Sequence, residues 1–476
     1  MSFEVALGLV MLATMIVAIF AGFPISFTLL FLAFAFGWYG LGDIVFSLAH
    51  LQTVGLMKES LLAAVPLFIF MGFVSERAGL MERLFVALRL ALAPVRGALF
   101  IVVILTAAAF AMATGIVGAA VTVLGIMAAP IMVRTGYDGR LAAGAITAGG
   151  TLGILIPPSV MLIVMGPVLG VSVADLYAAA IVPGFMLAGL YVLYVLVRSY
   201  LNPNLGPPVP KELRASSVVA VVREVLVGVV PLAALVSATL GSILLGLATP
   251  TEASGMGAAG ALLLAAAYRK LTWQAFKHAL LQSLATSSMV LMLALTSNIF
   301  GAVFARLGGA DWITESLLAL PLPPTLMLAL VTVLIFLLGW PFEWPAIILV
   351  FLPIFYPVVV ALEVDLVWFG TLVAVTLQTA YLSPPVAMSA YYLKQVVQDW
   401  SLLTIYRGMF QFMGIQVVAI ALLFAFPALA TWLPERLFQS GALVVSDPAL
   451  EPVQGSATGY EAQLQRALES ARRPVK

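Results

Sequence analysis

The chain has 476 residues, of which 63% are hydrophobic and only 9% are charged. Soluble domains carry about 25% charged residues, so this composition predicts a polytopic α-helical membrane protein. The net charge of +1 does not suggest a nucleic-acid partner, and the absence of cysteine excludes disulfides, thiol catalysis and thiolate metal sites.

The first hundred residues are expected to form three apolar spans and two interfacial helices. Spans are predicted at about residues 5–21, at 25–39 after a Gly-Phe-Pro turn, and at 61–73. Residues 41–60 are mixed in character and are expected at the membrane interface. Residues 76–96 carry four arginines among leucines at helical spacing, which indicates a surface helix.

An uncharged stretch at residues 97–133 is too long for a single span. It could form one tilted helix, two full spans with a tight turn, or a re-entrant hairpin that turns inside the protein. We favour the hairpin, with its tip at Thr114-Gly115, because small residues there permit close helix contact.

A second uncharged run, from Leu141 to Ala174, contains Pro157 and Pro158 near its middle. Each proline removes a backbone donor and clashes with the carbonyl one turn earlier, so the helix must open there. Lipid cannot satisfy the freed carbonyls. Residues 140–168 are therefore predicted to form a broken helix that faces protein, water or an ion.

Both signals return in the second half of the chain. Residues 317–362 again hold too much apolar sequence for one span, which predicts a second re-entrant hairpin with its tip at 338–346. Residues 366–393 form another uncharged run that Pro384 and Pro385 interrupt, which predicts a second broken helix over residues 366–395. Two broken helices in corresponding halves indicate the binding site of a secondary transporter.

The predicted organisation is an inverted repeat. Residues 1–200 form the first repeat, 201–224 a cytoplasmic linker, 225–432 the second repeat and 433–476 a polar, disordered tail. Basic residues favour the cytoplasmic side, and about fifteen of them lie there if the hairpins enter from opposite faces. This topology places both termini outside.

The broken helices bring main-chain carbonyls, which suit a cation, together with helix N-termini, which suit a carboxylate. The hydroxyls of Thr114, Ser159, Thr379 and Ser383 can add ligands. Oxygen ligands without carboxylates fit a monovalent ion such as sodium better than calcium or zinc. Because no catalytic constellation accompanies them, the sequence predicts a transporter and not an enzyme.

Three acidic residues need separate interpretation. Glu343 lies between two tryptophans at the second hairpin tip and is either functional at depth or a carboxylate at the outer mouth. Glu252 is expected to have a structural role in the first turn of a helix, where the helix dipole favours it. Asp138 is expected to be a turn residue.

Several motifs occur together in one order: Gly22-Phe23-Pro24, Pro66–Gly72, Gly136-Tyr137-Asp138, Leu152–Ser159, Pro183-Gly184, Thr249–Ala253 and Ser383–Val386. In this combination the chain resembles, from about residue 21 to 432, the large membrane subunit of tripartite ATP-independent periplasmic (TRAP) transporters, the DctM-like family. The resemblance implies an elevator-type, sodium-driven importer of organic acids in the bacterial inner membrane. It also implies two partners, a small four-helix membrane subunit (DctQ-like) and a periplasmic solute-binding protein (DctP-like).

The same resemblance implies where the ligands bind. The implied sodium ligands are Thr114, Gly115, Gly153, Leu155, Pro157, Pro158, Gly339, Glu343, Thr379, Ser383 and Pro384. The residues expected to contact substrate are Gly118, Ser159 and Pro385.

The chain departs from the family pattern at both tips. Many relatives have a Gly-Ser-rich first tip, whereas residues 114–117 read Thr-Gly-Ile-Val, and Ser383 and Ala387 replace Thr and Gly at the second break. The stretch 113–118 is similar to the branch associated with mannitol, chloroaromatic or 2-oxo acid uptake. We therefore expect monocarboxylates such as 2-oxo acids or lactate as substrates. The alternative is a stand-alone ion-coupled carboxylate carrier without a binding protein.

Overall fold

The computed structural model describes residues 2–115, 117–208, 217–384 and 387–439. Every regular element within these ranges is a helix. Eight of the described helices are long and apolar enough to cross a membrane. The prediction of an all-α, multi-pass membrane protein is confirmed.

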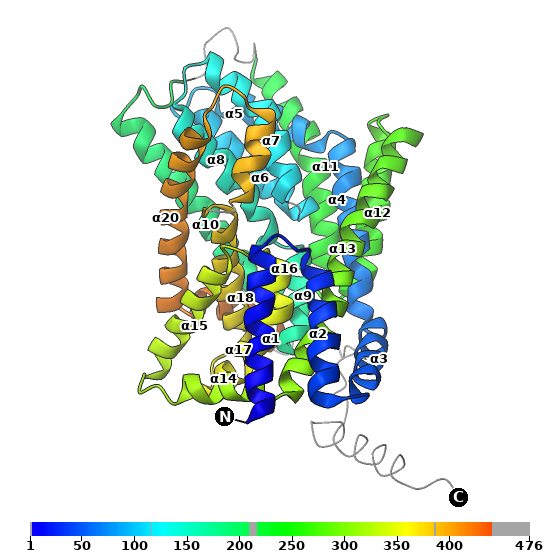
Figure 1. Ribbon diagram of the computed structural model, residues 1–476. Coiled ribbons are helices and arrows are strands. Elements are labelled where there is room, and N and C mark those ends of the chain that lie inside the picture. Colours follow the sequence, from blue (N-terminus) through cyan, green and yellow to red (C-terminus); the bar gives the residue numbers. More distant parts are fainter. Residues whose placement is uncertain (1, 116, 209–216, 385–386, 440–476) are drawn as a thin grey trace, which may run out of the picture.

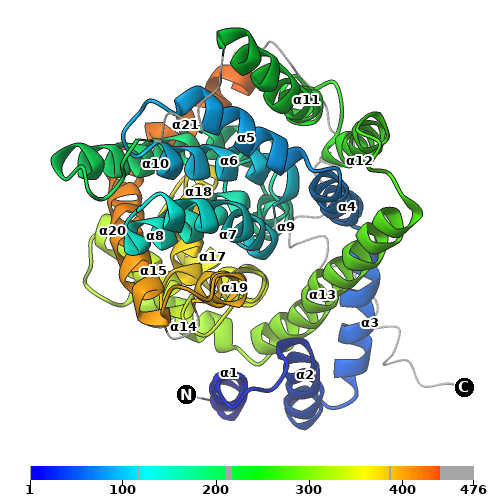
Figure 2. The same ribbon diagram turned by 90° about the horizontal axis from the view of Figure 1, so that it is seen from above.

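Seven helices form an arc along one side of the molecule, which we call the outer layer (Figure 2). Within it, α4 packs against α12 and α13, and α13 also contacts α2 and α3. The short turn η1 (Ser60–Ala63) joins α3 to α4. The outer layer consists of α1 (Phe3–Phe20), α2 (Ile25–Leu41), α3 (Ile44–Met57), α4 (Ala64–Arg77), α11 (Val218–Leu244), α12 (Pro250–Ala267) and α13 (Trp273–Arg306).

The remaining helices form an inner bundle, whose first half contains a hairpin and a broken helix. The hairpin α6–α7 turns at Gly115, whose φ of +61° favours glycine. The chain then forms α8, a 3₁₀ turn and α9, with a non-helical stretch before Val160. The elements of this half are α5 (Leu80–Leu92), α6 (Ala98–Thr114), α7 (Val117–Arg134), α8 (Gly139–Thr151), η2 (Leu152–Ile154), α9 (Val160–Leu169) and α10 (Val173–Leu201).

The second half of the inner bundle repeats this order. A π-helical turn, η4, lies in the returning arm of its hairpin. Its elements are α14 (Gly309–Leu318), α15 (Pro324–Leu338), α16 (Trp344–Ala346), η4 (Ile347–Phe351), α17 (Leu352–Ala361), α18 (Leu366–Gln378), η5 (Thr379–Tyr381), α19 (Met388–Val396), α20 (Leu402–Ala425), α21 (Ala428–Pro434) and η6 (Glu435–Gln439).

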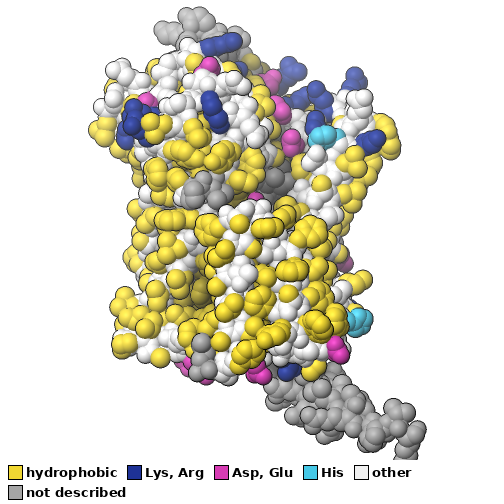
Figure 3. Space-filling view, viewed as in Figure 1, with side chains coloured by type: hydrophobic (Ala, Val, Ile, Leu, Met, Phe, Trp, Pro, Cys, Tyr) yellow, Lys and Arg dark blue, Asp and Glu magenta, His cyan; other side chains and the backbone are white. Residues whose placement is uncertain are grey.

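The broken helices of the two halves match at an offset of 227 residues. Helices α8 and α18 begin and end 227 positions apart, and so do the 3₁₀ turns η2 and η5. Even the caps correspond, because Asp138 and Asp365 accept hydrogen bonds from the amides three residues later, at 2.8 and 2.7 Å. Hairpin α6–α7 lies at the end of the molecule where Lys and Arg gather, and the α15–α17 hairpin lies at the opposite end (Figures 1 and 3). The predicted inverted repeats, hairpins and broken helices are confirmed.

Glycines allow close packing around the first broken helix. A Cβ atom on Gly150 would lie 2.3 Å from a methyl group of Val121 in the hairpin. A Cβ atom on Gly408, in α20, would lie only 2.0 Å from the carbonyl oxygen of Arg140. Backbone approach of this kind is how small residues hold helices together in lipid, where the hydrophobic effect does not drive helix association.

Some predicted boundaries differ from the structure. The linker expected at 201–224 is shorter, because Ser217 caps α11, which begins at Val218. The second hairpin, expected from residue 317, begins at Pro324 because α14 occupies the preceding segment. The tail expected to be polar and disordered from 433 continues as helix to Gln439. The rest of that tail lies outside the described residues.

Two of the predictions about acidic residues can be checked directly. Asp138 caps α8 and is therefore more than the turn residue expected from sequence. Glu252 forms a capping box with Thr249, accepting from the Thr249 amide at 2.8 Å while its own amide donates to the Thr249 hydroxyl at 3.3 Å. The structural role expected for Glu252 is confirmed.

Candidate substrate and ion site

A cavity of about 220 Å³ lies where the two repeats meet the outer layer. Both hairpin tips contribute to it, and so do both broken helices, together with α4 and α13. It is lined by Ile69, Gly115, Val117, Gly118, Ile154, Val160, Thr286, Met289, Val290, Glu343, Trp344, Pro345, Tyr381 and Tyr392. Elements far apart in the sequence therefore converge on one small space, which we call the central cavity.

The first break releases backbone carbonyls for the reason anticipated from the sequence. Pro157 and Pro158 have no N–H, so the carbonyls of Gly153 and Ile154, four residues earlier, lose their helical donors. The Ser159 hydroxyl replaces the donor for Ile154. The Gly153 carbonyl receives no helical donor from Pro157 and is available as a ligand.

The first hairpin tip packs directly on this break. A Cβ atom on Gly115 would lie 3.7 Å from both the Gly153 carbonyl oxygen and the Val160 amide nitrogen. The tip therefore faces a negative partial charge from the end of one helix and a positive one from the start of α9. We call the Gly115–Gly153 contact region the first half-site.

The second break frees a carbonyl in the same way, but its serine stands before the prolines and not after them. Pro384 removes the helical donor for the Ala380 carbonyl, and the Ser383 hydroxyl donates to the Thr379 carbonyl at 2.8 Å. A Cβ atom on Gly339, at the second hairpin tip, would lie 2.9 Å from the Ala380 Cβ. We call this contact region the second half-site. Ala380 and Gly153 are 227 residues apart, so the repeat places equivalent carbonyls in the two half-sites.

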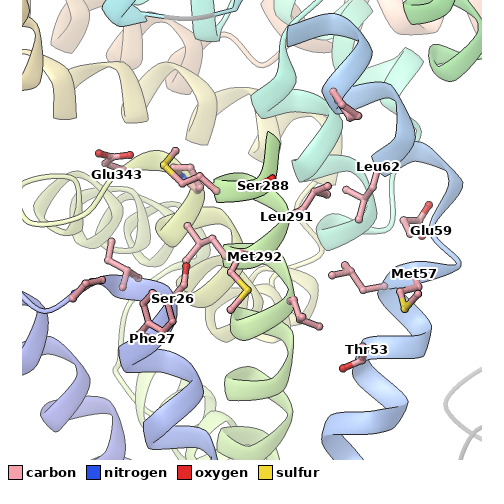
Figure 4. A pocket seen from close by; sticks show the side chains of 18 of the residues that line it. Ser26, Phe27, Thr53, Met57, Glu59, Leu62, Ser288, Leu291, Met292 and Glu343 are labelled. Atoms are coloured by element: carbon pink, nitrogen blue, oxygen red, sulfur yellow. The ribbon is translucent and has the colours of Figure 1, made fainter. Parts of the chain in front are cut away.

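Among the described residues that line the central cavity, Glu343 carries the single charged side chain. It precedes α16, but its carboxylate makes no capping hydrogen bond. It also borders a larger apolar cavity of about 1080 Å³ that α2, α3, η1, α4 and α13 line (Figure 4). Glu343 thus borders both the central cavity and this second space.

Most of the predicted site residues lie at the hairpin tips and breaks, but only some of them line the central cavity. Gly115, Gly118 and Glu343 line the central cavity. The other described candidates lie at the breaks and tips behind that lining: Gly153, Leu155, Pro157, Pro158, Ser159, Gly339, Thr379, Ser383 and Pro384. The Thr114 side chain and Pro385 lie outside the described part of the chain.

The hydroxyl groups are already engaged with nearby carbonyls. Ser159 is fully buried and donates to Ile154, and Thr379 is fully buried and donates to the Thr376 carbonyl at 2.6 Å. Their oxygens keep lone pairs with which to ligate a cation. Ser159, expected to contact substrate, is not part of the cavity lining, because the next residue, Val160, faces the cavity instead.

Sequence reasoning missed several residues of this site. Tyr381 and Tyr392 bring aromatic rings and hydroxyls to the central cavity, and Thr286 contributes from α13. Nothing in a single sequence places these residues beside hairpin tips that lie tens to hundreds of positions away. Ala380 could have been found, because the carbonyl four residues before a helix-breaking proline is the one that loses its donor.

Comparisons with known proteins place this architecture in a family. A family model described as "Tripartite ATP-independent periplasmic transporter, DctM component" matches residues 12–429. The sialic acid TRAP transporter large permease protein SiaM of Vibrio cholerae is 28% identical over 428 residues, which cover 89% of this chain and 97% of that protein. The C4-dicarboxylate TRAP transporter large permease protein DctM of Pseudomonas aeruginosa is 29% identical over 386 residues, covering 80% and 87%.

The fold is also similar to a solved membrane transporter. The YdaH transporter of Alcanivorax borkumensis superposes with a TM-score of 0.59 at 17% identity, covering 83% of this chain and 90% of that one. At that identity the likeness concerns the fold alone. On the strength of the family match over most of its length, the chain belongs to the DctM component family of tripartite ATP-independent periplasmic transporters.

Proposed function

We propose that the chain is the large permease subunit of a sodium-coupled importer that takes up small organic acids with the help of a binding protein. The observation that carries this proposal is the central cavity, where two inverted hairpin tips meet two broken helices. Midplane sites built from discontinuous helices at a repeat interface are the general design of secondary transporters.

Sodium as the coupling ion is supported by the chemistry of the half-sites. Their available ligands are main-chain carbonyls and hydroxyls, which are hard oxygen donors. The described residues contain no group of three or more His, Cys, Asp or Glu side chains that could hold a metal ion. A monovalent cation needs less ligand charge than calcium or zinc and therefore fits this donor set best.

The substrate we propose is a small monocarboxylate such as a 2-oxo acid or lactate. Val117 begins α7 and Val160 begins α9, and both line the central cavity, so two helix N-termini favour a carboxylate there. Glu343 would repel a second carboxylate. A cavity of about 220 Å³ is smaller than the 300–1,000 Å³ of typical ligand pockets, which favours few-atom substrates. Relatives carry names that specify sialic acid and C4-dicarboxylates.

Two partners complete the proposed importer. One is a small four-helix membrane subunit, DctQ-like, and the other is a periplasmic solute-binding protein, DctP-like. A relative in Oleidesulfovibrio alaskensis is named "Isethionate TRAP transporter permease protein DctMQ", and this chain covers 51% of its length. In the bacterial inner membrane we place the Lys- and Arg-rich end of the molecule in the cytoplasm (Figure 3).

We further propose that transport proceeds by an elevator motion, in which the inner bundle carries both half-sites past the outer layer. The support is the division of the molecule itself. The hairpins and broken helices belong to the inner bundle, and the outer layer contributes only apolar and hydroxyl side chains to the central cavity.

Reconstituted uptake tests the proposal. Proteoliposomes that contain both membrane subunits, with the binding protein added outside, should accumulate a labelled 2-oxo acid under an inward sodium gradient. Replacing sodium with potassium should abolish accumulation, and unchanged uptake in potassium would refute sodium coupling. Full uptake without the binding protein would instead favour the stand-alone carboxylate carrier.

A further inference from the structure

A cluster of polar side chains lies inside the inner bundle, apart from the central cavity. Thr151, Gln378 and Gln416 are all fully buried. The Thr151 hydroxyl shares its one proton between the Ala148 carbonyl of its own helix, at 2.8 Å, and Gln378 Oε1, at 3.2 Å, and it accepts from Gln416 Nε2 at 3.5 Å. The buried hydroxyl of Tyr191 lies beside Thr151 and Gln416. None of the four residues lines the central cavity, and we call them the polar junction.

The position of the junction in the repeat is its most informative property. Thr151 is the last residue of α8 and Gln378 is the last residue of α18, 227 positions later. Each residue is followed at once by the 3₁₀ turn of its own break. The carbonyls of Gly153 and Ala380, which lose their helical donors, lie only two residues further along. The Thr151–Gln378 hydrogen bond therefore connects equivalent points just before the two breaks.

The junction is incompletely paired. Among the described residues, Gln378 Nε2 and Gln416 Oε1 have no hydrogen-bond partner. Buried polar groups are nearly always paired, and apolar residues would fill these positions without that cost. One unpaired amide atom is a donor and the other is an acceptor, and both amides already contact the Thr151 hydroxyl.

We propose that the polar junction is a positioning device that couples the two half-sites, so that a cation bound at one break fixes the other break in its binding geometry. The proposal rests on the sodium coupling proposed above. The link acts through the two 3₁₀ turns, because moving either turn changes the geometry of the Thr151–Gln378 bond. Coupling of this kind gives positive cooperativity in sodium activation.

Two substitutions break the link from opposite sides, and two controls keep it intact. Thr151→Val removes the hydroxyl with little change in volume, and Gln378→Leu removes the amide. Thr151→Ser keeps the hydroxyl. Thr147→Val removes another fully buried hydroxyl one turn earlier in α8, which bonds only to the Ala143 and Gly144 carbonyls of its own helix.

The measurement is the sodium dependence of substrate uptake by the complete transporter in proteoliposomes. The unaltered protein should show a Hill coefficient well above 1. Thr151→Val and Gln378→Leu should each lower it to about 1, because uncoupled sites bind independently. The double variant should be no worse than either single variant, since both remove one link. Thr151→Ser and Thr147→Val should keep the original value.

Several results would overturn the inference. A Hill coefficient that Thr151→Val and Gln378→Leu leave unchanged would do so, and so would an equal loss in Thr147→Val. Thermal unfolding followed by tryptophan fluorescence shows whether each variant folds. If Gln378→Leu does not fold, the comparison of Hill coefficients between Thr151→Val and Thr151→Ser tests the inference. If the unaltered protein takes up substrate without sodium, the proposed sodium coupling is refuted, and the inference that rests on it is refuted as well.

Discussion

The crossing of α20 over α8 gives a sharp test of how the first broken helix is held. Gly408 in α20 lies so close to α8 that a Cβ atom would sit 2.0 Å from the Arg140 carbonyl oxygen and 2.8 Å from the Gly144 amide nitrogen. Ordinary contacts begin near 3.4 Å. Both obstacles are backbone atoms, so no side-chain rotation can relieve them. Gly408→Ala must therefore push the two helices apart.

The magnitude follows from two opposing effects. Replacing glycine by alanine within a helix stabilises it by about 0.5–1 kcal/mol, whereas overpacking a close contact costs about 1–3 kcal/mol. Gly408→Ala should lose stability on balance. Gly414→Ala is the matched control, because it lies in the same helix and a Cβ atom there meets nothing within 4 Å. It gains the same helix propensity without the clash.

Thermal unfolding of the purified protein, followed by the fluorescence of its eight tryptophans, measures the difference. Gly408→Ala should melt below the unaltered protein and Gly414→Ala at or above it. Because α8 leads directly into the first half-site, Gly408→Ala should also weaken sodium activation of uptake. Equal melting temperatures for the two variants would refute the packing at this crossing.

Three further changes test other parts of the account. Gly118→Val should abolish uptake, because its side chain would enter the central cavity beside the Tyr392 ring, from which a Cβ atom would lie only 3.0 Å; melting measured in parallel shows that the variant folds, and normal transport would contradict the cavity's role. Asp138→Ala should destabilise the protein by about 1 kcal/mol in thermal unfolding through loss of an N-cap, whereas Asp138→Asn should retain most of the stability. Ser383→Ala should raise the sodium concentration needed for half-maximal uptake. The control is Thr376→Val, which removes a buried hydroxyl that bonds within its own helix and should leave that concentration unchanged. Equal responses of the two variants would argue against a hydroxyl ligand at the second break.

Proline chemistry explains how much of the fold can be predicted. Single prolines such as Pro183 and Pro231 lie within continuous helices, whereas the adjacent prolines at 157–158 and 384–385 remove two helical donors in succession, so the sequence predicts a break at each pair. Uncharged runs too long for one span then predict the hairpins. The first residues of the helices are harder to predict from sequence. Asp138 and Ser217 are residue types common in loops, and only the structure shows that each caps the helix that follows it.

The site could be predicted only in part, for a related reason. Main-chain ligands near a break are set by local sequence, and Gly115 and Gly153 do meet. Contacts between the two repeats depend on tertiary packing, which local sequence patterns do not indicate. Tyr392 reaches the first hairpin from α19, and Gln416 reaches the first break from α20. Both contacts exist only because the inverted repeats interlock.

Direct binding of radioactive sodium to the purified subunit tests the central claim, that unwound backbone at the two inverted breaks holds the coupling cation. Scintillation proximity should reveal saturable binding of ²²Na⁺ that excess unlabelled sodium displaces and excess potassium does not. Binding should weaken in Ser383→Ala but not in Thr376→Val. The absence of saturable binding, or displacement by potassium as effective as by sodium, would contradict the account.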